Sequence, residues 1–171
     1  FVGHGAPDLR TRDAYLVPSD GDPNYPATSF RLDELYRSLN RMPAKNVTLI
    51  IDACFSGQVG RGSQMEMLLA GARGIVVESR FVEIDPHLIV FTAAHGNQVS
   101  SSYPEMSHGL FTYFVFKGLK GHADENEDDE ITVRELFDYV REQVMKRAGY
   151  LDREQTPELQ GQDLDRVLVK Y

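Results

Sequence analysis

Three stretches of the chain are apolar runs in which hydrophobic and polar residues do not alternate. They are KNVTLIID (45–52), ARGIVVES (72–79) and PHLIVFTAA (86–94), and all of them contain valine and isoleucine. Runs of this kind are typical of strands that are buried on both faces, as strands are in parallel sheets. The pattern therefore predicts a largely parallel sheet.

Three other stretches carry apolar residues at the spacing of one helical face. They span residues 29–42, 108–121 and 131–149, and in the last of them Leu136 and Val140 are four residues apart. Such spacing predicts amphipathic helices, because residues four apart lie on the same side of a helix. Helices that alternate with buried strands predict an α/β fold with helices on both faces of the sheet.

Two remaining segments complete the expected organisation. DRVLVKY (165–171) predicts a last strand, and residues 6–28, with four prolines and several aspartates, predict a long loop at the functional edge of the sheet. The chain contains no repeat and no low-complexity linker, so residues 1–171 are expected to form a single domain.

The charge and the cysteine content restrict the function. Lysine and arginine number 18 against 26 aspartates and glutamates, and this net charge of −8 disfavours a nucleic-acid partner. No apolar run is long enough to span a membrane. One cysteine excludes an internal disulfide and a thiolate-rich zinc site, and it suits a reducing compartment, so the expected location is the cytoplasm.

That cysteine, Cys54, stands directly after the first predicted strand, in LIIDACFSGQ (49–58). Open α/β sheets bind ligands outside the carboxyl ends of their strands, and the FSG that follows permits a sharp turn there. A lone cysteine is more often a small buried hydrophobe. Its place after the apolar run rather than within it favours a nucleophile.

A thiol nucleophile needs a base, because the thiolate is the attacking species. Of the five histidines, His4 lies between two glycines, which let the backbone approach a substrate and leave an unhindered N–H at Gly5. His95, after the strand 86–94, is the alternative base. The other three histidines occupy places typical of the protein surface.

Several motifs in this order resemble one family. They are GHG (3–5), YLVPSD (15–20), DACFSG (52–57), HGLFTYFVFKGLKG (108–121) and QTPELQG (155–161). The chain is similar to the caspase-type cysteine peptidases, and most similar to their bacterial metacaspase and orthocaspase branch. The resemblance implies a caspase-hemoglobinase-like fold, a three-layer α/β/α sandwich around a mostly parallel sheet.

The resemblance also implies the chemistry. Cys54 would be the nucleophile, His4 the general base and later general acid, and the N–H groups of Gly5 and Cys54 the oxyanion hole. No cofactor is required for this reaction. Family members carry further strands before GHG, so we expect that amino-terminal strands are missing from this chain and that another segment or a second chain completes the sheet. Val2 stands where many relatives carry a small hydroxyl residue.

Asp52 bears on substrate preference. Residues two apart in a strand point to the same side, so Asp52 and Cys54 should face one crevice. A carboxylate there raises the pKa of the thiol unless a cation compensates, and a basic substrate side chain would supply that cation. We therefore expect cleavage after Arg or Lys. The alternative is that Asp52 only hydrogen-bonds its own turn.

A second group of acidic residues lies in DENEDDEITVRE (124–135), between two predicted helices. Positions 1, 3, 5, 7 and 12 of the calcium-loop pattern fall on Asp124, Asn126, Asp128, Glu130 and Glu135. Asp129 takes the place of the usual glycine, which should weaken binding. The alternative is a solvated acidic turn that caps the next helix.

Together these features predict a cysteine endopeptidase that acts on protein or peptide substrates through a thioester, after Arg or Lys. Two other functions stay open. One is a catalytically silent caspase-like interaction module, and the other is a different Cys–His acyl hydrolase, such as a separase-like relative. Neither nucleic acid nor a membrane is an expected partner.

Overall fold

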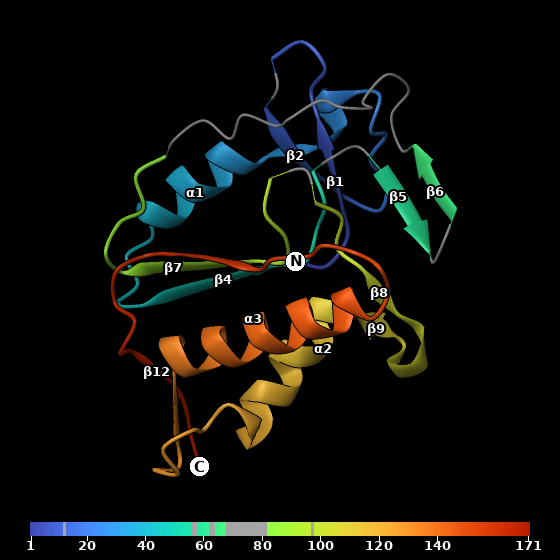
Figure 1. The fold of residues 1–171 in the computed structure, drawn as a ribbon. Helices are drawn as coiled ribbons and strands as arrows, with labels where there is room; N and C mark the ends of the chain where they lie inside the picture. The colour runs from blue at the N-terminus through green and yellow to red at the C-terminus, as the bar shows by residue number, and fades with distance from the viewer. Residues whose placement is uncertain (12, 56–57, 62–63, 68–81, 97) are drawn as a thin grey trace.

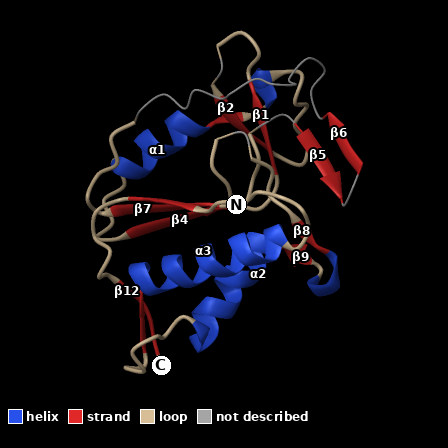
Figure 2. Ribbon diagram, viewed as in Figure 1, coloured by secondary structure: helices blue, strands red, loops and turns tan. Residues whose placement is uncertain are grey.

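The computed structural model describes residues 1–11, 13–55, 58–61, 64–67, 82–96 and 98–171. The predicted strand 72–79 lies outside these residues. A central sheet separates one helix, α1 (Leu32–Asn40), from two others, α2 (Leu110–Lys117) and α3 (Val133–Gly149). Figure 1 shows α1 on one side of the sheet and the other two helices opposite it, and Figure 2 shows the same layers coloured by type. The prediction of helices on both faces is confirmed.

The central sheet contains β4 (Val47–Ile51), β7 (Leu88–Thr92) and β11 (Glu158–Gln160) in the order β11-β7-β4. β4 and β7 are parallel, and their register pairs Val47 with Leu88 and Ile51 with Thr92. The parallel pairing agrees with the prediction. β11 runs antiparallel to β7 and was not predicted as a strand.

The beginning of the chain lies beside the end of β4. Val2 forms a parallel bridge with Asp52. The Asp52 N–H donates to Phe1 O at 2.9 Å, and the Gly3 N–H donates to Asp52 O at 3.1 Å. Residues 1–3 therefore run parallel to β4. As a consequence His4 lies at the carboxyl edge of the sheet, next to the segment that follows β4.

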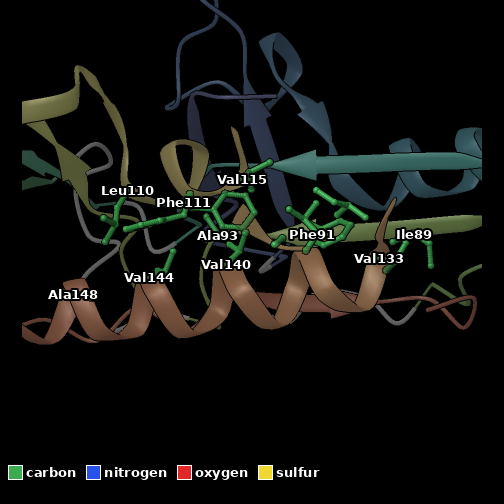
Figure 3. Packing of buried hydrophobic residues seen from close by; sticks show 14 residues of the cluster. Ile89, Phe91, Ala93, Leu110, Phe111, Val115, Val133, Val140, Val144 and Ala148 are labelled. Carbon is green, nitrogen blue, oxygen red and sulfur yellow. The ribbon is translucent and has the colours of Figure 1, made fainter. Parts of the chain in front are cut away.

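Successive residues of β7 point to opposite faces, and both faces are covered. Ile89 and Phe91 pack with α2 and α3, as Figure 3 shows, whereas Leu88 and Val90 pack with α1. All four side chains are buried, and each such burial stabilises the fold by about 1.5–3 kcal/mol. Two-sided burial explains why this strand is an unalternated apolar run.

The prediction of a loop over residues 6–28 was wrong in part. β1 (His4–Pro7) and β2 (Ala14–Val17) pair antiparallel, and β2 also pairs with β3 (Phe30–Arg31). Apolar side chains of β2 pack in the same cluster as α1, and this packing stabilises strands too short to show a pattern. For the same reason the helix predicted over 29–42 begins only after β3.

Two strands near the carboxyl terminus form a small sheet separate from the central one. The predicted last strand is β12 (Val167–Lys170), but it pairs with β10 (Glu130–Thr132) and not with the central sheet. The remaining elements are η1 (Pro26–Thr28), the hairpin of β5 (Gln58–Arg61) and β6 (Gln64–Met67), the hairpin of β8 (Ser102–Tyr103) and β9 (His108–Gly109), η2 (Pro104–Met106) and the turn η3 (Gly118–His122). Among the described residues, no helix combines the length and the apolar character needed to cross a membrane.

Candidate active site

Cys54 lies just beyond the carboxyl end of β4, at the sheet edge where its sequence position predicted it. The side chain is half-buried, and Sγ accepts a hydrogen bond from the Ser100 N–H at 2.7 Å. Burial raises the pKa of the thiol to about 11; the Ser100 N–H opposes this rise and the Asp52 charge adds to it. A thiol that is neutral near pH 7 would need a base to take its proton if it acted as a nucleophile.

The segment that carries His4 packs directly against Cys54. A Cβ at Gly5 would lie 2.6 Å from the backbone oxygen of Cys54 and 2.6 Å from the Phe55 ring. Only glycine therefore allows β1 to approach this closely. The fold thus brings the GHG and DACFSG motifs together.

The His4 side chain is exposed, and no hydrogen bond joins it to the thiol in the described part of the chain. Such a bond is often long or absent until substrate binds. His95, the alternative base, has its Nδ1 hydrogen-bonded to the carboxylate of Glu158. Glu158 belongs to β11, on the far side of β7 from β4. The position of Gly5 therefore favours His4 over His95.

The expected oxyanion donors lie on the two segments that meet here. Among the described residues, the Cys54 N–H donates no backbone hydrogen bond. Gly5 belongs to β1, opposite Leu16 of β2. An oxyanion hole made by Gly5 and Cys54 stays a prediction.

Asp52 is 5% exposed, and three donors surround its carboxylate. The Ser100 hydroxyl donates to Oδ1 at 2.5 Å. Thr112 donates to Oδ2 from its N–H at 3.2 Å and its hydroxyl at 2.5 Å. These donors come from the segment after β7 and from the first turn of α2, and not from the turn that follows Asp52 itself. The side chains of Asp52 and Cys54 both contact Ser100, as expected if they face one crevice.

A pocket of about 650 Å³ lies in front of this carboxylate. Gly109 and Thr112 line it, and both are in contact with Asp52: a Cβ at Gly109 would lie 2.4 Å from Oδ2. The other lining residues are Val2, Ser102, Pro104, Ser107, His108 and Phe116. The carboxylate of Asp52 therefore lies behind the wall of a pocket whose described lining residues include no acidic side chain.

The acidic loop 124–135 begins after the carboxyl end of α2. Asp52, in contrast, contacts Thr112 in the first turn of that helix. The Asp124 carboxylate accepts the N–H groups of Asp128 at 3.2 Å and Asp129 at 3.1 Å. Asp129 has a φ of 62°, so it adopts the left-handed conformation that the missing glycine would favour. These carboxylates bind backbone amides, which is what the alternative of an acidic turn requires.

Glu135 caps the next helix, as the alternative of a solvated acidic turn expects. It forms a capping box with Thr132 at the start of α3, in which its Oε2 accepts the Thr132 N–H at 2.9 Å. Among the residues that the structure describes, no three histidine, cysteine, aspartate or glutamate side chains are grouped so that they could hold a metal ion. A calcium ion would need Glu135 to leave its cap.

Sequence reasoning missed Ser100, Thr112 and Gln155. Ser100 belongs to the run VSSS (99–102), which follows β7 at the same sheet edge as Cys54, and this position was the available signal. Thr112 and Gln155 lie within two of the motifs that carried the family resemblance, although nothing in their local pattern assigns them a contact.

The comparison with protein families agrees with this geometry. The family model described as the caspase domain matches residues 1–169, nearly the whole chain. A search of curated proteins found no match.

Proposed function

We propose that this chain, which belongs to the caspase-domain family of cysteine-type peptidases, is an endopeptidase of the metacaspase or orthocaspase kind. Its catalytic dyad would be Cys54 and His4. The contact of Gly5 with the Cys54 backbone supports this most directly. It places the residue after His4 against the nucleophile, at the carboxyl end of the central sheet.

The reaction would proceed in two steps. Sγ of Cys54 bonds to the substrate carbonyl carbon while His4 takes the thiol proton; the C–N bond then breaks, and His4 returns the proton to the leaving amine. Water next attacks the thioester, with His4 as base, and releases the carboxylic acid and the thiol. Two backbone N–H groups that bind the oxyanion would each contribute about 2.7–4 kcal/mol to the barrier reduction.

The raised pKa of Cys54 bears on the role of His4. With a thiol pKa of about 11, a preformed thiolate is rare near pH 7. His4 is then needed as the base that takes the thiol proton for attack. A substrate cation near Asp52 would offset the Asp52 charge, which adds to the effect of burial on this pKa.

For the substrate we propose Arg or Lys before the scissile bond. An ionised carboxylate has about four acceptor positions, and the three donors to Asp52 leave about one for a guanidinium or ammonium group. An approach through the neighbouring pocket would bring a basic side chain to the wall formed by Gly109 and Thr112. An acidic side chain would meet a buried like charge and be rejected.

The direct test is a panel of fluorogenic peptides that differ only in carrying Arg, Lys, citrulline or Asp before the cleaved bond. Arg and Lys peptides should be cleaved by the wild type and not by Cys54→Ala, and His4→Ala should be strongly slowed. Citrulline separates the charge of arginine from its shape. Undiminished turnover by Cys54→Ala would end the proposal.

Two alternatives predict other results in the same panel. A catalytically silent interaction module would cleave none of the peptides, and the Cys54 thiol would not react with a peptide electrophile faster than with iodoacetamide. A different Cys–His acyl hydrolase, such as a separase-like relative, would react with the electrophile but would not prefer a basic residue.

Calcium binding at residues 124–135 stays a prediction from the sequence. The loop follows the carboxyl end of α2 and supplies none of the contacts to Cys54 or Asp52 described above. Calcium, if bound there, would stabilise the folded state and take no part in the chemical step.

A further inference from the structure

The side chain of Gln155 is 1% exposed and makes three hydrogen bonds to the segments that follow β7. Its Oε1 accepts the Ser101 N–H at 2.8 Å. Its Nε2 donates to Ala93 O at 3.0 Å and to the Ser100 hydroxyl oxygen at 3.4 Å. Gln155 thus joins the residues before β11 to the carboxyl end of β7 and to Ser100 and Ser101.

Ser100 is in turn the one residue described as bonded to both Cys54 and Asp52. Its N–H donates to Sγ of Cys54, and its hydroxyl donates to Oδ1 of Asp52. The position of Ser100 therefore determines where its N–H points relative to the Cys54 sulfur and where its hydroxyl points relative to the Asp52 carboxylate. Gln155 bonds to the Ser100 hydroxyl and to the N–H of the next residue, and so holds that position.

From these contacts we infer that Gln155 is a positioning residue, which keeps Ser100 and Ser101 where Ser100 can hold the thiol and the Asp52 carboxylate at the site. The catalytic meaning of this inference rests on the proposed function. The structural part of the inference, that Gln155 controls the environment of the Cys54 sulfur, does not depend on the proposed function.

The direction of the effect follows from the Ser100 N–H. A donor to the sulfur favours the thiolate, so loss of this bond raises the pKa of the thiol. The titratable groups that bear on the thiol are Asp52, at the end of the same strand, and His4, next to the Gly5 that packs against Cys54. Neither contacts Gln155, so both are retained when Gln155 is replaced.

A matched control exists at the other end of the same sheet. Arg166 is 8% exposed and donates to His87 O at 2.9 Å and to Pro86 O at 3.2 Å. It therefore holds the amino-terminal ends of β4 and β7 as Gln155 holds the carboxyl end of β7. Loss of either side chain removes hydrogen bonds to backbone carbonyl groups and lowers stability.

The experiment compares Gln155→Met with Arg166→Met. Melting temperatures identify a temperature at which both variants are folded. At that temperature the rate of Cys54 alkylation by iodoacetamide is measured from pH 7 to pH 10, and kcat and KM are measured with an Arg peptide. Wild type and Cys54→Ala are included, the latter as the blank for alkylation.

In Gln155→Met we expect the alkylation rate at pH 8 to fall about tenfold, the change that accompanies a thiol pKa higher by about one pH unit. We expect kcat to fall about tenfold or more, since small displacements of a reacting group are costly. Arg166→Met should lose melting temperature but keep both rates within about twofold of wild type, because it touches neither Ser100 nor Ser101.

An alkylation rate in Gln155→Met that equals or exceeds that of the wild type would overturn the inference, as would equal losses in both variants. If the wild type cleaves none of the peptides, the proposed function fails, and the alkylation profiles still decide whether Gln155 controls the thiol. If Gln155→Met does not fold, Gln155→Asn is measured in its place. Its amide is neutral but one methylene shorter and cannot keep all three hydrogen bonds, so a fall in alkylation at pH 8 is again expected.

Discussion

Replacing Asp52 by asparagine should change thiol reactivity and peptidase activity in opposite directions. The side chains are nearly the same size, and the amide oxygen can still accept both donors of Thr112. The amide NH₂ would then face the Ser100 hydroxyl, which can accept a hydrogen bond as well as donate one. We therefore expect Asp52→Asn to fold.

The stability cost follows from the three hydrogen bonds to the carboxylate. Bonds to a charged group contribute about 1.5–3 kcal/mol each and neutral ones about 0.5–1.5 kcal/mol, and removal of a buried charge offsets part of the loss. A net loss of about 1–3 kcal/mol should lower the melting temperature by about 2–12 °C for a domain of this size.

The effect on the thiol is electrostatic. Two residues along a strand separate the charges by about 6.6 Å, and at an effective dielectric constant of about 20 their repulsion is about 2.5 kcal/mol. Asp52 is the smallest of the three main influences on a thiol pKa that is raised from 9.0 to about 11. Asp52→Asn should therefore lower that pKa by about one pH unit and increase alkylation at pH 8 about tenfold.

The rate of cleavage after Arg or Lys should fall in Asp52→Asn. An ion pair at about 4 Å contributes about 4 kcal/mol at the same dielectric constant, and loss of even part of it reduces kcat/KM by more than about tenfold. Citrulline peptides should be affected much less. Asp85→Asn, at the amino-terminal end of β7, is the matched control and should change neither rate.

Stopped-flow alkylation and steady-state cleavage by one preparation of Asp52→Asn measure both effects. If alkylation and Arg cleavage fall together, the substitution has disturbed the site as a whole and the electrostatic argument is refuted. Faster cleavage after Asp than after Arg by the wild type would refute the assigned specificity directly.

Three further outcomes are expected. If calcium binds at residues 124–135, it should raise the melting temperature through binding to the folded state, and Asp124→Ala with Glu135→Ala should abolish the shift; a surviving shift would place the ion elsewhere, and no shift would leave the acidic turn. Since folding raises the thiol pKa from 9.0 to about 11, its contribution to stability is complete below pH 9 and lost as pH rises to 11. Urea unfolding should show a loss of about 2 kcal/mol at pH 10.5 relative to pH 8 that Cys54→Ala lacks, and identical curves would contradict it. Gly109→Ala should cost about 1–3 kcal/mol because its Cβ would lie 2.4 Å from a buried carboxylate oxygen, whereas Gly149→Ala, with nothing within 4 Å, should not; equal melting temperatures would refute the crowding argument.

The sequence was sufficient to predict the elements whose signal is local. β4 and β7 were found because strands covered on both faces must be apolar throughout, and α3 because one face of it packs on them. The same patterns located Cys54 at a carboxyl strand end. Short β2 and β3 were missed, since their stability comes from pairing and from packing with α1 rather than from their own residues.

The contacts of the candidate site were decided by the tertiary structure alone. Cys54 and Ser100 are 46 residues apart, Asp52 and Thr112 are 60 apart, and Ser101 and Gln155 are 54 apart. A hydrogen bond requires atoms within about 3 Å and suitable angles, and no periodicity encodes such a distance between remote segments. The carboxyl ends of β4 and β7 meet Gly5, the start of α2 and the residues before β11 only when the hydrophobic layers close, because that packing brings the polar groups within reach of one another.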